Sequence, residues 1–162
     1  MEIIKVYKQK FPEMKLVGKK YGPKSNGYSS EWGQWFQNNW FGPLESLVAD
    51  LGMEDAFIGL IRCRPEFEYW IGVFAKADAE VPEGYESVML PEGEAAIAWI
   101  YGSDENGEIY GAEAHAACTQ KFTEQGWQTG KANWFFERYV CPRFTNPDKL
   151  GNVILDHGVF LE

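Results

Sequence analysis

The sequence predicts an α+β fold built from duplicated βαββ units, related by a pseudo-two-fold axis, with an antiparallel sheet, two packing helices and a central ligand groove. Three observations predict it. The order of elements in the first half recurs in the second, short sequence motifs recur at matching places, and the middle strands of the two halves align residue by residue. We expect a single domain over residues 1–162, with half-repeats at about 1–78 and 79–162.

The first helix is predicted from its cap and its apolar spacing. Ser29 or Ser30 can cap it, and it opens with Glu31. Its large rings recur at i, i+3, i+4 and i+8, which is one face of a 3.6-residue period. These rings are Trp32, Trp35, Phe36 and Trp40. Such a stripe favours a core, although four large rings leave one or two to overhang a groove.

The strands are predicted from β-rich runs bounded by turn residues. The runs are 14–21, 56–64, 69–77, 94–101, 134–141 and 153–161. A second helix is predicted over about 108–125. Aligning the middle strands of the two halves on Cys63 and Cys141 sets Gly59 against Glu137. Two such units would leave a groove at their junction, where ligands commonly bind.

Charge and cysteine content exclude several function classes. The net charge of -9 repels phosphate backbones, so we expect no direct nucleic-acid binding. No run approaches the length of a membrane span, and no signal peptide is evident, so no membrane association is expected. Three cysteines without a CxxC pair stand in apolar runs that typically bury small thiols, which indicates a reducing, cytoplasmic location.

Aromatic residues are unusually frequent, with 7 tryptophans, 8 tyrosines and 11 phenylalanines in 162 residues. Apolar surface beyond the needs of a core commonly lines a ligand site or an interface. Composition alone leaves a ligand site and a plain core equally open.

Glu137 is the strongest candidate for a functional side chain. Its strand is so apolar that both faces are expected to be covered, and a carboxylate there must be paired, protonated, solvated or reserved for a cationic guest. Strand alternation places Phe135, Glu137 and Tyr139 on one face. Gly59, as the symmetry mate, is expected to leave volume opposite. The alternative is an ordinary salt bridge to an arginine such as Arg62 or Arg143.

Other polar and aromatic residues are weaker candidates. Several rings on the predicted strands can close a box around a cation. They are Tyr69, Trp70, Trp99 and Tyr101. His115, which lies among alanines, is expected to be a packed or surface residue. No metal-ligand spacing, nucleophile motif or phosphate loop is present, so no metal and no cofactor are predicted.

Five short sequence motifs, spread along the chain in a fixed order and spacing, carry a resemblance that extends over nearly the whole sequence. They are 15–18, 31–36, 67–73, 82–85 with 90–93, and 136–139. In them the chain resembles the GyrI-like small-molecule-binding family, whose domain is also the effector-binding domain of AraC-type and MerR-type multidrug-responsive regulators. The resemblance implies that the family's pocket glutamate, which meets cationic drugs and dyes, corresponds to Glu137, and a pocket tyrosine to Tyr69.

The expected function is therefore stand-alone, multidrug-type binding of lipophilic, cationic aromatic compounds in an aromatic pocket around a buried Glu137. The expected ligand-binding residues are Glu137, Tyr69, Trp99, Tyr139, Trp35, Trp40, Phe36 and Phe135. Because no helix-turn-helix is visible, a sensor, buffer or sequestering protein is expected.

Two alternatives remain open. Some stand-alone GyrI-like proteins hydrolyse cyclopropane-bearing, DNA-alkylating natural products. A similar detoxifying hydrolase would use Glu137 to activate water and Tyr69 to polarise the conjugated carbonyl. The other alternative is an interaction protein resembling a gyrase inhibitor, with an exposed aromatic face and DNA gyrase as its partner.

Overall fold

The structure is a computed structural model that describes residues 1–161. Its elements, in chain order, are β1 (Glu2–Phe11), β2 (Met14–Tyr21), α1 (Ser29–Gln37), the 3-10 helix η1 (Gly42–Leu44), α2 (Glu45–Leu51), β3 (Ala56–Arg62), β4 (Glu68–Lys76), β5 (Glu86–Leu90), β6 (Gly93–Ser103), α3 (Gly111–Glu124), β7 (Trp134–Val140) and β8 (Asn152–Phe160). Within the described range no helix has the length and apolar character needed to cross a membrane.

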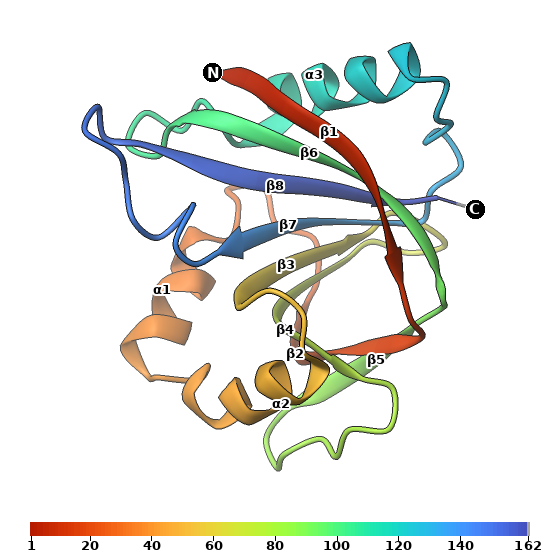
Figure 1. Cartoon of the computed structure of the whole chain (residues 1–162). Coiled ribbons are helices and arrows are strands. Elements are labelled where there is room, and N and C mark those ends of the chain that lie inside the picture. Colours follow the sequence, from red (N-terminus) through yellow and green to blue (C-terminus); the bar gives the residue numbers. More distant parts are fainter. Residues whose placement is uncertain (162) are drawn as a thin grey trace.

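All eight strands form one antiparallel sheet in the order β1-β6-β8-β7-β3-β4-β2-β5 (Figure 1). Reversing this order exchanges β7 with β3, β8 with β4, β6 with β2 and β1 with β5, so the sheet has the predicted two-fold arrangement. The α+β class and the antiparallel sheet are confirmed. The half-repeat boundaries at about 78 and 79 stay a prediction.

Two strands, β1 and β5, are absent from the sequence-based assignment. Each precedes one unit, so the units are ββαββ, and each pairs with the other unit: β1 with β6 and β5 with β2. Both are edge strands. The charged residues of β1 and the shortness of β5, which has five residues with one glutamate, hide the apolar runs that reveal the central strands, as is common at exposed sheet edges.

Helix α1 is shorter than the aromatic stripe suggests. It begins at Ser29 without a side-chain cap and ends at Gln37. Asn39 then adopts a φ of 52°, in the left-handed region that terminates helices. The chain turns back, and the Trp40 backbone N–H donates to the Trp35 carbonyl at 2.9 Å. Trp40 therefore lies outside the helix, and the four-ring helical stripe is wrong at its last member.

Helix α3 begins at Gly111, three residues later than predicted. Glu108 closes the preceding turn instead, since its carboxylate accepts a hydrogen bond from the Ser103 backbone N–H at 2.9 Å.

The sheet has two differently packed faces. On the face that we call the helical face, α1 packs on a cluster from β2, β3 and β4, and α3 packs on a cluster from β6 and β8. Phe135, at mid-sheet, packs against both clusters. The opposite face carries a third cluster, in which Phe11, Phe74 and Phe136 meet edge to face. Figure 1 shows α3 along one half of the sheet and α1 and α2 along the other.

The cysteines do not all occupy buried sites. Cys118, on α3, is buried, whereas Cys63 and Cys141 are exposed. Each exposed cysteine directly follows a strand, β3 or β7, at the point where the chain leaves the sheet. The expectation of three buried thiols is wrong for these two.

Candidate functional site

Glu137 occupies the centre of the sheet, where the two halves meet. On β7 it lies opposite Gly59 of β3 on one side and opposite His157 of β8 on the other. Its side chain is half-buried on the helical face, as are those of Phe135 and Tyr139. The carboxylate therefore stands between the part of the sheet covered by α1 and the part covered by α3.

Nothing within residues 1–161 neutralises this carboxylate, since no ion pair includes it. The two arginines considered as partners are engaged elsewhere: Arg62 with Glu68, and Arg143 with Glu54 and Asp156. Burial raises the pKa of Glu137 to about 7, and a long 3.4 Å hydrogen bond from the Tyr139 hydroxyl offsets this only in part. Glu137 is thus poised between its protonated and ionised forms near neutral pH.

Three tyrosines belong to the surroundings of Glu137, and the hydroxyl of one, Tyr139, contacts its carboxylate. Tyr69 comes from β4, Tyr139 from β7, and Tyr110 immediately precedes α3. Burial raises the pKa of each, and the negative charge of Glu137 raises it further. The three hydroxyls therefore stay protonated. That of Tyr139 donates to Glu137 at 3.4 Å, whereas that of Tyr110 donates to the Asp104 carboxylate. We refer to Glu137 and these three tyrosines, with the rings packed on them, as the Glu137 cluster.

Two further rings extend the cluster towards α1. The Trp32 indole N–H donates to the Tyr69 hydroxyl at 2.8 Å, and its ring centroid lies 4.9 Å from that of Tyr139. Tyr28 stacks on Tyr69 at 3.8 Å with nearly parallel planes. A Cβ on Gly59 would come within 3.1 Å of the Tyr69 hydroxyl and 3.3 Å of Trp32. Gly59 therefore admits these two side chains, and the expected vacant volume above it is filled.

Two histidines form the wall of the site on the α3 side. His157 stacks on His115 at 4.5 Å, and burial lowers the pKa of His157 to about 3 and lowers that of His115 as well. His157 Nδ1 and His115 Nε2 are buried and have no hydrogen-bond partner among the described residues. Both rings are therefore neutral and offer unpaired nitrogens. In the described part of the chain no three His, Cys, Asp or Glu side chains are placed to hold a metal ion.

The structure brings together three of the eight residues predicted to bind ligand, Glu137, Tyr69 and Tyr139. Phe135 lies beside them, edge to face with His115 at 5.7 Å. Sequence reasoning did not assign four members of the cluster to the site: Tyr28, Trp32, Tyr110 and His157. Trp32 was visible in the aromatic stripe, but only the packing of α1 shows which ring of that stripe faces the carboxylate.

The other four predicted residues lie elsewhere. Trp35 is fully buried in the α1 cluster, where its indole donates to the Tyr21 hydroxyl. Trp40 lies near the Lys19 ammonium, and Phe36 is 56% exposed. Trp99 belongs to the opposite face of the sheet, between Lys5 and Arg143.

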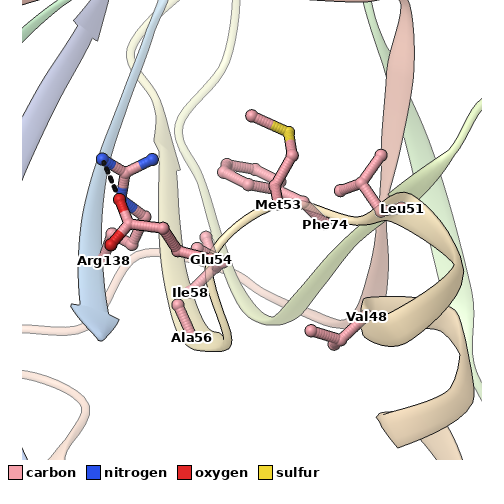
Figure 2. Close-up of a pocket in the computed structure, with 8 residues that line it drawn as sticks. All are labelled: Val48, Leu51, Met53, Glu54, Ala56, Ile58, Phe74 and Arg138. Atoms are coloured by element: carbon pink, nitrogen blue, oxygen red, sulfur yellow. Dashed lines mark ion pairs between the residues drawn. The ribbon is translucent and has the colours of Figure 1, made fainter. Parts of the chain in front are cut away.

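Two hollows lie outside the Glu137 cluster. The smaller, on the opposite face of β3 and β4, is lined by α2 side chains and by the Glu54–Arg138 ion pair, with 3.6 Å between the charged atoms (Figure 2). The larger is a cleft of about 700 Å³ between α1, α2 and the start of β3. Val48, Met53 and Ala56 line both, so the two hollows adjoin at α2.

A search among protein-family models and a search among curated proteins found no match to this chain. Solved structures do match. SAV2435 bound to tetraphenylphosphonium superposes with a TM-score of 0.70 at 16% sequence identity, over 98% of this chain and 94% of that one.

Two further neighbours match over 98% of this chain. The regulator EcmrR, solved on DNA, has a TM-score of 0.59 at 15% identity and is covered over 57% of its length. A hydrolase encoded by lin2189 of Listeria innocua has a TM-score of 0.52 at 11% identity and is covered over 92%. At these identities the likeness concerns the fold. The chain has the GyrI-like fold, as the sequence resemblance predicted.

Proposed function

We propose that this protein binds lipophilic organic cations of aromatic character at the Glu137 cluster. The observation that carries the proposal is a carboxylate at the junction of two half-sheets that lacks a cationic partner among residues 1–161 and is surrounded by aromatic rings. A guest cation supplies the missing charge, and the faces of Trp32 and the tyrosines add cation–π attraction of about 0.5–2 kcal/mol per well-placed ring. The solved neighbour bound to tetraphenylphosphonium supports this class of guest.

The protonation of Glu137 gives the proposal a second signature. A bound cation favours the ionised carboxylate, whose pKa in the free protein is about 7. Below that pKa, binding must displace a proton, so affinity is expected to fall about tenfold per pH unit. Above it, affinity reaches a plateau.

The test is a titration with tetraphenylphosphonium, followed by tryptophan fluorescence and calorimetry, of the wild type and Glu137→Gln. At pH 8 we expect the variant to bind at least about tenfold more weakly. Glu86→Gln, which makes the same charge change at an exposed position of β5, should bind like the wild type. Equal affinity of Glu137→Gln and the wild type at pH 8 would contradict the proposal.

Titration with a neutral ligand separates the contribution of the positive charge to binding from that of the aromatic rings. Triphenylphosphine oxide carries similar rings without a positive charge. Its affinity should be the same in the wild type and in Glu137→Gln, because the rings remain in place. A parallel loss of both guests would show instead that the substitution disrupts the cluster.

One observation favours a hydrolase as the second candidate. A glutamate with a pKa near 7, next to protonated tyrosine hydroxyls, has the properties of a general base at neutral pH. Glu137 would take a proton from a water molecule while the oxygen of that water attacks the cyclopropane carbon. The breaking carbon–carbon bond would deliver its electron pair to the conjugated carbonyl, which becomes a phenol on gaining a proton. Tyr69 would polarise that carbonyl by donating a hydrogen bond, and the proton would come from solvent, because burial raises the pKa of Tyr69 and makes it a weaker acid than the product phenol.

Product analysis decides between the two candidates. Incubation with a cyclopropane-bearing alkylator should give the water adduct in the wild type and none in Glu137→Gln, while the variant still binds the neutral substrate. Stoichiometric binding without product would remove the hydrolase candidate and leave the binding proposal intact.

The tryptophans give no support to the interaction-protein alternative. Trp35 and Trp70 are buried and the other five are half-buried, so they form no exposed aromatic face.

A further inference from the structure

The 700 Å³ cleft lies beside the Glu137 cluster but does not include it. Its walls come from α1, from the corner between α1 and α2, and from the start of β3. A volume of this size is typical of small-molecule sites. Figure 2, which draws the smaller hollow, labels the three side chains that line both hollows, Val48, Met53 and Ala56.

Three phenylalanines form the apolar wall of the cleft. Phe41 and Phe57 lie 4.3 Å apart, and Phe36 meets both, at 5.4 Å and 5.3 Å respectively. Phe41 is buried, Phe57 is half-buried, and Phe36 is 56% exposed. The rings are thus held by one another while one of them stays open to solvent. This arrangement presents an apolar surface to an aryl or alkyl group.

Two carboxylates stand at the same cleft. Glu45 opens α2, and Asp55 directly precedes β3, where strand alternation places it on the same face as Phe57. Within residues 1–161 neither side chain takes part in an ion pair or a side-chain hydrogen bond, and no Lys, Arg or His lines the cleft. The cleft therefore combines an aromatic wall with unneutralised negative charge.

The cleft and the Glu137 cluster share a wall but not a space. Phe57 lies opposite Tyr139 in the sheet, and Trp32 stacks on Phe36 at 6.3 Å. Asp55 lies level with Cys141, four residues along β7 from Glu137, which is about 13 Å at the rise of a β-strand. Two small guests at this separation do not overlap.

We propose that this cleft is a second binding site, for a lipophilic organic monocation. The hydrocarbon part of the guest packs on Phe36 and Phe57, and its positive charge lies between Glu45 and Asp55. The site does not depend on Glu137, so it can exist whether or not the proposed function of the Glu137 cluster is correct.

Calorimetric stoichiometry with tetraphenylphosphonium at pH 8 tests the second site. We expect two equivalents in the wild type, one in Glu137→Gln and one in the double variant Glu45→Gln/Asp55→Asn. The double variant Asp78→Asn/Glu83→Gln removes two exposed carboxylates outside the cleft and should keep both equivalents. Phe36→Ala, at an exposed ring, should weaken the equivalent that remains in Glu137→Gln by about tenfold.

The outcomes separate the two sites. A single equivalent that Glu137→Gln abolishes and that the Glu45/Asp55 variant leaves unchanged would overturn the second site and keep the proposed function. A single equivalent with the reverse pattern would keep the cleft and overturn the Glu137 proposal. A second equivalent that survives the Glu45/Asp55 and Phe36 changes also overturns the assignment to the cleft.

Discussion

Glu137 and Arg138 are neighbours on β7 with opposite charges and opposite surroundings. Arg138, on the face opposite α1 and α3, is 3% exposed and donates to Asp156 at 2.9 Å, to Gln9 at 3.1 Å and to the Tyr7 hydroxyl at 3.2 Å. Glu137, on the helical face, has one long hydrogen bond from Tyr139 and no ion pair among the described residues. Strand β7 thus carries a paired charge, Arg138, on one face and an unpaired charge, Glu137, on the other.

The difference separates a charge that the protein itself neutralises from one that has no partner among the described residues. Asp156 bridges Arg138 and Arg143, and Glu54 completes the group, so the charges on that face are neutralised by the protein itself. Removing a charge from such a group is costly because its partner stays buried. Removing the unpaired Glu137 leaves no such partner behind. We therefore expect the fold not to depend on Glu137 for its stability, as a role in binding would require.

The largest expected effect is a loss of stability on removing a charge from the face that carries Arg138 and Asp156. Asp156→Asn should lower the free energy of unfolding by about 3–5 kcal/mol, because it leaves Arg138 buried without its closest anion. Glu137→Gln makes the same carboxylate-to-amide change on the adjacent strand and should not destabilise the protein. Urea denaturation at pH 7 measures both. Equal destabilisation of the two variants would break the comparison.

The next effect is a pH dependence of stability. Glu137 and His157, which lie opposite each other on β7 and β8, are expected to contribute to it with opposite signs. The pKa of Glu137 is raised from 4.5 to about 7, so the folded state holds a proton that the unfolded state lacks, and stability falls as pH rises from 4.5 to 7. The pKa of His157 is lowered from 6.5 to about 3, so its contribution to stability rises between pH 3 and 6.5. Each slope is about 1.4 kcal/mol per pH unit, and they cancel where they overlap.

Glu137→Gln removes only the falling slope. Relative to the wild type, the variant should gain stability steadily from pH 4.5 to 7 and then keep a constant gain of up to about 3 kcal/mol. Thermal or urea unfolding of both proteins at pH 4, 6 and 8 measures the difference. A stability difference independent of pH would mean that the pKa of Glu137 is not raised.

A smaller effect distinguishes two tryptophans on the two faces. Trp32→Phe removes the hydrogen bond to Tyr69 and the indole above Gly59, and should weaken binding of tetraphenylphosphonium about threefold to tenfold. Trp99→Phe changes a ring between Lys5 and Arg143 on the opposite face and should leave the affinity unchanged. Calorimetry on the two variants is the measurement. Weaker binding in the Trp99 variant alone would restore the sequence-based assignment of that residue.

The smallest effect is expected at Tyr139. Its 3.4 Å hydrogen bond is long, so Tyr139→Phe should change the affinity for tetraphenylphosphonium at pH 8 by no more than about twofold. Since that bond lowers the pKa of Glu137, its loss should move the midpoint of the pH dependence of binding upwards. A midpoint shifted downwards would contradict the assigned hydrogen bond.

The elements that could be predicted share a strong local pattern. The central strands β3, β4, β7 and β8 are apolar on both faces, so their positions follow from the sequence to within a few residues. The edge strand β1 carries scattered charges and β5 is only five residues long, so both became visible only through their partners in the sheet. The end of α1 depends on the left-handed conformation of Asn39, which the aromatic spacing does not reveal.

The strand residues at the centre of the candidate site could be predicted, but the aromatic residues that surround them could not. Strand alternation and the duplicated pattern are local, so they were sufficient to place Glu137 with Phe135 and Tyr139 opposite Gly59. The face to which Trp99 belongs depends on the pairing of β6 with β8, in which Trp99 lies opposite Asp156 and Ala98 opposite His157. A shift of one residue in that register would exchange the two faces.

The sequence by itself determined the α+β class, the duplicated order of elements and the acidic residue at their junction, because periodicity and strand alternation are properties of neighbouring residues. Only the tertiary structure decided that Glu137 lacks a partner among the described residues while Arg138 has several, and that Trp32 rather than Trp99 stands beside it. The physical reason is that burial and charge pairing depend on side chains far apart in the chain, whose meeting is set by sheet register and helix packing.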